Sequence, residues 1–174
     1  MGEGEEYKTM SRPKVGVTVD TAWVQRHAVE NLLRRHDIPY NIAGTVADVR
    51  PIEVSGGQSL YQLSISDPSS GDEAALLERV LGTISDNAFP PPDNRVRLTP
   101  RQTEQWNGAR FLCAHRREGH TVFVTDNAAL FGRPDSAKRQ RLSELIGTRF
   151  LSFAEFERWC SEPGRKGPRS RTDT

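Results

Sequence analysis

The stretch Thr121-Val-Phe-Val-Thr125-Asp126-Asn127 is a β-branched and aromatic run that ends abruptly in a carboxylate. An earlier run, Lys14-Val-Gly-Val-Thr-Val19-Asp20-Thr21, ends in the same way. Short apolar runs of this composition predict buried strands. The carboxyl ends of parallel strands meet at one edge of an open sheet, where ligands bind. The two runs therefore predict that Asp20 and Asp126 lie close together.

Helical patterns separate and follow these two strands. The segment from about 22 to 36 places Val24, Ala28, Leu32 and Leu33 on one face, and Pro39 then prevents the helix from continuing. Three later helix starts have the same signature, a serine or threonine followed three residues on by glutamate or glutamine. These capping boxes are Ser70–Glu73, Thr99–Gln102 and Ser152–Glu155.

The C-terminal half also contains clear stop signals. Gly119 fits the left-handed end of the helix that begins at Thr99, and Gly147 follows a predicted helix over 136–146. A short strand over 148–151 comes next, and the final helix ends near Cys160.

Residues 42–66 alternate only weakly between apolar and polar side chains. This pattern allows strands but does not fix them, with Gly56-Gly57 as a turn between them. Pro90-Pro-Pro92 is a stiff connector that neither a helix nor a central strand can include.

The alternation of strands and helices predicts an α/β fold with a short, mainly parallel sheet between helices, in three layers as in Rossmann-like proteins. Residues 1–12 are expected to form a disordered acidic lead, 13–162 the folded domain and 163–174 a disordered basic tail. Neither terminal segment contains enough apolar surface to offset its loss of chain entropy on folding.

The bulk composition excludes several classes of protein. The 174-residue chain has a net charge of +1, so no global field marks it as a nucleic-acid binder. No apolar run approaches the roughly 20 residues that span a membrane, and the acidic N-terminus lacks the apolar core of a secretory signal. Cys113 and Cys160 have no metal-site spacing and are expected to be reduced, buried thiols. A cytoplasmic protein without a membrane partner is expected.

A family resemblance adds to this interpretation. The C-terminal half contains Ala114-His115-Arg-Arg-Glu-Gly119-His-Thr-Val-Phe-Val-Thr125-Asp126, and Gly147-Thr-Arg-Phe-Leu-Ser-Phe-Ala-Glu155-Phe follows. Together with the early Val19-Asp20-Thr21, this pattern resembles PIN-domain proteins over roughly residues 14–36 and 108–160. The resemblance implies a PIN-like α/β sandwich and, in active members, a ribonuclease that depends on Mg²⁺ or Mn²⁺ held by three or four acids. Many bacterial members are toxins paired with a small antitoxin.

The chain departs from that family at two of the acids. The family usually has an acid near the start of the helix before the second strand, where this chain has Asn107 and Gly108. Glu104 lies one turn earlier and could substitute if the helix is shifted. The central glutamate of the family has no secure equivalent, although Glu78 lies on a suitable helix face, with Glu73 and Glu53 as alternatives.

Asp20 and Asp126 are therefore the predicted catalytic carboxylates and metal ligands. Hard divalent cations bind oxygen ligands, and two close carboxylates would repel each other without a cation. The alternatives are local, namely a helix N-cap for Asp20 and a turn for Asp126 with Asn127. The candidate substrate-contacting residues share polar side chains near these acids. They are Thr21, Thr125, Asn127, Arg110, Lys138 and Arg139.

Other polar and aromatic residues favour structural roles. His115 lies near Leu112 and Cys113 on its predicted helix and is expected to be a satisfied, partly buried histidine. Trp23, Trp106 and Trp159 lie on three helices, where packing is the simpler explanation than base stacking. The basic side chains around 110–117 and 133–141 could meet a phosphate backbone or only form a solvated face.

Two functional hypotheses follow. The first is a metal-dependent ribonuclease of the PIN-like type, such as the toxin of a toxin–antitoxin pair, with Mg²⁺ or Mn²⁺ as cofactor and RNA and a small antitoxin-type protein as partners. The alternative is a catalytically degenerate PIN-like scaffold that binds RNA or a protein without cleavage, as the missing acid suggests. A homodimer is compatible with either hypothesis.

Overall fold

The computed structural model of the protein describes residues 13–45, 68 and 70–163. The acidic lead over 1–12, most of the basic tail, and the strands allowed between 46 and 66 lie outside these residues.

One parallel sheet forms the centre of the fold. Its strands are β1 (Val15–Val19), β2 (Tyr40–Gly44), β3 (Val122–Val124) and β4 (Arg149–Leu151), in the order β2-β1-β3-β4. All three pairings are parallel, so the predicted α/β class is confirmed. Val19 pairs with Gly44 on one side and with Val124 on the other. The three strands therefore end at the same level of the sheet.

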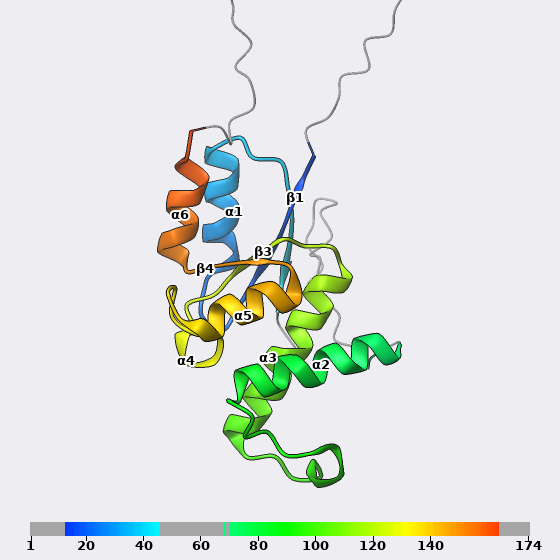
Figure 1. The fold of residues 1–174 in the computed structure, drawn as a ribbon. Helices are drawn as coiled ribbons and strands as arrows, with labels where there is room; N and C mark the ends of the chain where they lie inside the picture. The colour runs from blue at the N-terminus through cyan, green and yellow to red at the C-terminus, as the bar shows by residue number, and fades with distance from the viewer. Residues whose placement is uncertain (1–12, 46–67, 69, 164–174) are drawn as a thin grey trace, which may run out of the picture.

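Helices cover both faces of this sheet (Figure 1). Helices α1 (Arg26–Arg35) and α6 (Phe153–Ser161) lie side by side on one face. The other face carries α2 (Gly71–Ile84), α3 (Pro100–Arg117), α4 (Ala128–Phe131) and α5 (Ala137–Ile146). A short 3₁₀ turn, Pro92–Asn94, lies between α2 and α3.

The period-2 geometry of the strands divides the core into two clusters. Val122 and Val124 of β3 pack with β1, α1 and α6 in one cluster. Phe123, which lies between them, points the other way and packs against α2, α3 and α5 in the second. All three residues of β3 are therefore buried, because the strand contributes to both core clusters. This burial on both faces explains why the sequence of the strand is a continuous apolar run.

The predicted helix ends are largely confirmed. Thr99 and Ser152 form complete capping boxes, and the Ser70 side chain accepts the backbone N–H of Glu73. Gly119 and Gly147 have φ of +71° and +69°, the left-handed conformation expected after a helix.

Three local predictions differ from the structure. Helix α1 begins at Arg26 rather than at 22, because the chain after Asp20 first makes a tight turn in which the Asp20 carbonyl accepts the N–H groups of Trp23 and Val24. Strand β2 follows Pro39 directly as Tyr40–Gly44, a segment too short and mixed to show a clear alternation. The short helix α4 was not expected from the sequence.

The predictions about the cysteines and about membrane-spanning helices can also be compared with the structure. Cys113 and Cys160 are both buried thiols outside any disulfide. Within the described ranges, no helix combines the length and the apolar character needed to cross a membrane.

Candidate functional site

A pocket of about 590 Å³ lies where β1 ends and beside α3. Most of its polar lining comes from three places, the turn after β1, one face of α3 and the segment after β3. The lining residues that matter below are Asp20, Thr21, Trp23, Glu104, Asn107 and Asn127. This is the sheet edge at which ligands of open parallel sheets bind.

Asp20 is the buried acid of this pocket. Its residue is only 8% exposed, and its backbone N–H donates to the Val124 carbonyl at 2.9 Å, which extends the β1–β3 ladder by one step. Its Oδ2 accepts the Thr125 hydroxyl at 2.8 Å. Asp20 is not the N-cap of α1, because Gln25 holds that position. Its carboxylate is thus fixed by two adjacent strands and faces the pocket.

Helix α3 contributes the second acid, Glu104. The residues of α3 that line the pocket follow helical spacing and form one stripe. They are Pro100, Thr103, Glu104, Asn107, Gly108 and Phe111. Glu104 is exposed, and its negative charge acts on Asp20. The structure therefore brings Asp20 together with Glu104, the residue that the sequence offered only as a substitute.

Asn127, rather than Asp126, faces the pocket. The Asn127 amide Nδ2 donates to Glu104 Oε1 at 3.0 Å, while its Oδ1 caps α4 by accepting the Leu130 N–H at 3.1 Å. Asp126 is exposed, and its Oδ1 accepts the Phe153 N–H at the start of α6 at 2.9 Å. Neighbouring residues of an extended segment point to opposite sides. Asp126 therefore lies at the predicted sheet edge but does not line this pocket.

Gly108 is tightly packed against α4. A Cβ atom at Gly108 would lie 2.6 Å from Leu130 Cδ2, well inside the distance at which carbon atoms make contact. A side chain at Gly108 would therefore require the buried Leu130 side chain of α4 to shift. Asn107, one position earlier, is half-buried and lines the pocket.

The protonation of Asp20 responds to this setting. Burial raises the pKa of the Asp20 carboxyl above its usual value, and the negative charge of Glu104 adds to the rise. Hydrogen bonds from Thr125, the Ala22 backbone and Thr45 lower the pKa and oppose part of that effect. A buried carboxylate beside a second acid is the arrangement that a cation would stabilise.

The remaining predicted site residues make contacts elsewhere. Glu78 forms a two-bond ion pair with Arg95, at 2.7 and 2.8 Å. Lys138 donates to the Ile84 carbonyl and to Asp86. The Arg110 guanidinium lies 5.8 Å from the centre of the Trp106 ring. None of these three residues lines the pocket at Asp20, whereas Thr21 does.

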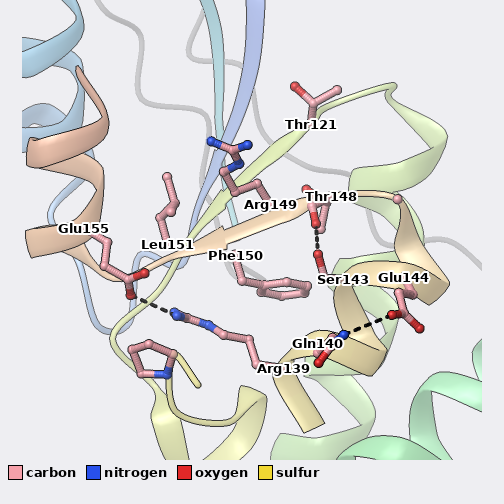
Figure 2. A pocket seen from close by; sticks show the side chains of 12 residues that line it. Thr121, Arg139, Gln140, Ser143, Glu144, Thr148, Arg149, Phe150, Leu151 and Glu155 are labelled. Carbon is pink, nitrogen blue, oxygen red and sulfur yellow. Dashed lines mark hydrogen bonds and ion pairs between the residues drawn. The ribbon is translucent and has the colours of Figure 1, made fainter. Parts of the chain in front are cut away.

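A second pocket, of about 680 Å³, runs along the free edge of β4 between α5 and α6 (Figure 2). Arg139 extends along it toward Glu155, and the two side chains form an ion pair at 2.8 Å. Gln140 donates to Glu144, and Ser143 donates to the Thr148 carbonyl. Because these polar groups bond mainly to one another, this pocket is the weaker candidate for chemistry.

A buried hydrogen-bonded network supports the strands behind the first pocket. The Thr18 hydroxyl lies between His115 Nδ1 at 2.7 Å and His120 Nδ1 at 2.9 Å, and His115 Nε2 lies 2.7 Å from the Thr148 hydroxyl. His115 is fully buried, and burial lowers its pKa to about 3. It is the satisfied core histidine that the sequence predicts.

The donor set of the first pocket suits a hard divalent cation. The side chains that could bind one there offer only oxygen ligands, from carboxylates, amides and hydroxyls, which Mg²⁺ and Mn²⁺ prefer. Mg²⁺ commonly keeps several waters and takes one or two protein carboxylates. In the part of the chain that the structure describes, no group of three or more histidines, cysteines or acids gathers to hold a metal. Asp20 and Glu104 would therefore provide both carboxylates.

Comparisons of the chain with protein-family models, with curated proteins and with solved structures each found no match.

Proposed function

We propose that this protein is a metal-dependent ribonuclease of the PIN-like type, with Asp20 and Glu104 as its acidic pair. The observation that carries the proposal is the meeting of these two carboxylates in one pocket, although they lie 84 positions apart in the sequence (104 − 20). The sheet edge at which they meet supports it as well. The resemblance of the strand-end sequences to PIN-domain proteins supplies the reaction class.

Each residue of the pocket has a defined role in this proposal. Asp20 and Glu104 would hold Mg²⁺ or Mn²⁺, with water completing its coordination. A divalent cation in such a site supplies Lewis-acid chemistry, because it stabilises charge on a phosphate and makes a nearby water more acidic. Asn127 positions Glu104 through their 3.0 Å hydrogen bond, and Thr125 positions Asp20.

The proposal assigns Asp126 a structural role. Its carboxylate accepts the first N–H of α6, where a negative charge also interacts favourably with the helix dipole. Since Asp126 supports the loop that contains Asn127, its removal is expected to affect stability more than chemistry.

An RNA-cleavage assay with Mn²⁺ tests this assignment. Asp20→Asn and Glu104→Gln keep the shape of each side chain and remove its charge, and each is expected to lower cleavage by roughly 100-fold or more. Asp126→Asn keeps the oxygen that accepts the Phe153 N–H and is expected to cleave at close to the wild-type rate. Loss of cleavage in Asp126→Asn together with full cleavage in Glu104→Gln would reverse the assignment.

A second candidate function is RNA or protein binding without cleavage. The specific observation that favours it is that the pocket contains two carboxylates, Asp20 and Glu104, whereas PIN-like enzymes hold their metal with three or four acids. Wild-type protein that binds RNA but shows no cleavage in Mg²⁺ or Mn²⁺ would select this function over the first.

The setting and partners are part of the same proposal. We propose a cytoplasmic protein, with which the two buried thiols outside any disulfide agree. The resemblance to PIN-domain toxins adds a small antitoxin-type protein as partner. Co-expression of a neighbouring small open reading frame that relieves growth inhibition by this protein would test that pairing.

A further inference from the structure

Trp23 is an exposed aromatic side chain at the mouth of the candidate site. It is 52% exposed, and among the residues that the structure describes only Val96 is another large hydrophobic side chain with high exposure. Val96 lies between α2 and α3, whereas Trp23 lines the same pocket as Asp20 and Glu104. The sequence alone favoured packing for this tryptophan, and its exposure calls for another explanation.

The backbone fixes Trp23 relative to Asp20. Its N–H donates to the Asp20 carbonyl at 3.0 Å, in the tight turn that follows β1. The neighbouring Val24 is buried in the core and donates to the same carbonyl at 2.9 Å. The main chain that carries the indole is thus held in place, although the ring itself is open to solvent.

The rest of the pocket suits a nucleotide. Its volume of about 590 Å³ is within the range of sites for small ligands. Phe111 and Pro100 provide apolar walls, and the Asn107 amide offers both a donor and an acceptor to a base edge. Proteins commonly bind unstacked bases by stacking them on an aromatic side chain and by forming hydrogen bonds to their edges.

The positively charged side chain of Arg26 lies beside the same turn. The aliphatic stem of Arg26 passes 4.0 Å from the point where a Cβ on Gly44 would stand, and the Thr21 methyl lies at 2.8 Å from that point. Arg26 Nε is buried without a hydrogen-bond partner. Arg26 therefore brings a positive charge near Thr21, which lines the pocket, and this charge favours an anionic nucleic acid over an apolar peptide.

We propose that Trp23 is a substrate-positioning residue on which a base of a single-stranded nucleic acid stacks, next to the phosphate that enters the pocket. This inference rests on the proposed function for the identity of the reaction, but the stacking itself requires no cleavage. Bases in a duplex are already stacked on one another, so the platform selects single strands.

Fluorescence titration with a short single-stranded oligoribonucleotide tests the proposal. The titrations use the Asp20→Asn background, which prevents turnover, and compare Trp23→Ala and Trp23→Phe with the unsubstituted indole. Trp23→Ala is expected to bind about 5- to 100-fold more weakly, and Trp23→Phe to retain most of the affinity. Quenching of tryptophan emission by the oligonucleotide should vanish in both variants. Trp106→Phe is the matched control, because Trp106 stacks on Phe89 and should leave binding and quenching intact.

Equal affinity of Trp23→Ala and the parent for the oligonucleotide would overturn the stacking role, as would an equal loss for a duplex of the same sequence. Kinetics with the catalytic aspartate restored separate this inference from the proposed function. If Trp23→Ala cleaves RNA with an unchanged KM, Trp23 does not position the substrate, and the proposed nuclease activity stands. If binding depends on Trp23 but no cleavage occurs, the stacking role stands and the proposed nuclease activity is wrong.

Discussion

Thr125 donates its hydroxyl hydrogen to the Asp20 carboxylate at 2.8 Å and thereby joins the ends of two adjacent parallel strands. The same hydroxyl oxygen accepts the Asn127 N–H at 3.0 Å. One threonine therefore holds the buried acid and the segment that positions Glu104. The candidate site depends on this residue although Thr125 has no charge of its own.

Thr125→Val should weaken the site without disturbing the core, because valine has nearly the same shape. Loss of two hydrogen bonds among buried groups is expected to lower the free energy of unfolding by about 1–3 kcal/mol. Mn²⁺ affinity should fall as well, since the Asp20 carboxylate loses a bond that favours its charged form. Urea unfolding and calorimetry measure the two effects. Thr121→Val, at the exposed start of the same run, is the control and should change neither.

Asp20→Asn should stabilise the metal-free protein at neutral pH. Burial is the largest cause of the raised pKa of Asp20. The ionised Asp20 carboxylate therefore lowers the stability of the folded state at neutral pH. A raised carboxyl pKa means that the folded state binds the proton more tightly than the unfolded state does. Stability of the wild type therefore increases as pH falls through the folded pKa toward 3.8. The advantage of Asp20→Asn in thermal midpoint should shrink over that range, and an advantage independent of pH would contradict this cause.

His115 should make the protein sensitive to acid. The pKa of His115 is lowered to about 3 in the folded state, from a usual value of 6.5. Between these two pH values the imidazole is protonated in the unfolded state but stays neutral in the folded state. Stability is thus fully present above pH 6.5 and is lost as pH falls toward 3, with a loss of about 2 kcal/mol at pH 5.

His115→Phe tests this origin of acid sensitivity. Phenylalanine keeps a ring against Phe123, whose centre lies 5.4 Å away, but leaves the buried Thr18 and Thr148 hydroxyls without the histidine. The variant should be less stable at neutral pH and should lose stability less steeply between pH 7 and 5. His27→Gln on the surface is the control. An unchanged slope in His115→Phe would assign the acid sensitivity to other groups.

Asn107→Asp should add a third carboxylate to the pocket. Asn107 lies three residues after Glu104 on the pocket-facing stripe of α3, and we expect Mn²⁺ affinity to increase by about tenfold. Gly108→Asp is the informative contrast, because its side chain would collide with Leu130. That variant should lose about 1–3 kcal/mol of stability and gain no affinity. Unchanged Mn²⁺ affinity in Asn107→Asp would mean that the stripe does not face a metal.

The sequence predicts the scaffold well because its signals are local. The Thr99 and Ser152 capping boxes, the left-handed glycines 119 and 147, and the apolar run around Phe123 each depend on nearby residues only. Strand β2 was not isolated because Tyr40–Gly44 is defined by its pairing with β1 rather than by its own pattern.

The site was predicted less well because it depends on direction and packing. Asp20 and the strand end after β3 lie at the same edge as expected, but alternation along the extended segment turns Asp126 toward α6 and Asn127 toward the pocket. The four-residue spacing of Glu104 and Gly108 on one helix face was available in the sequence. What the sequence does not show is that Leu130 fills the space at Gly108, a contact between residues that lie far apart in the chain.

Calorimetric titration with Mn²⁺ tests the central claim, that Asp20 and Glu104 together form the metal-binding pair, most directly. The wild type should bind one ion, and both Asp20→Asn and Glu104→Gln should weaken binding by tenfold or more, that is, by about 1.4 kcal/mol each. Asp126→Asn, whose carboxyl position faces α6, should bind as the wild type does. Binding that survives both Asp20→Asn and Glu104→Gln, or that is lost in Asp126→Asn alone, would contradict the account.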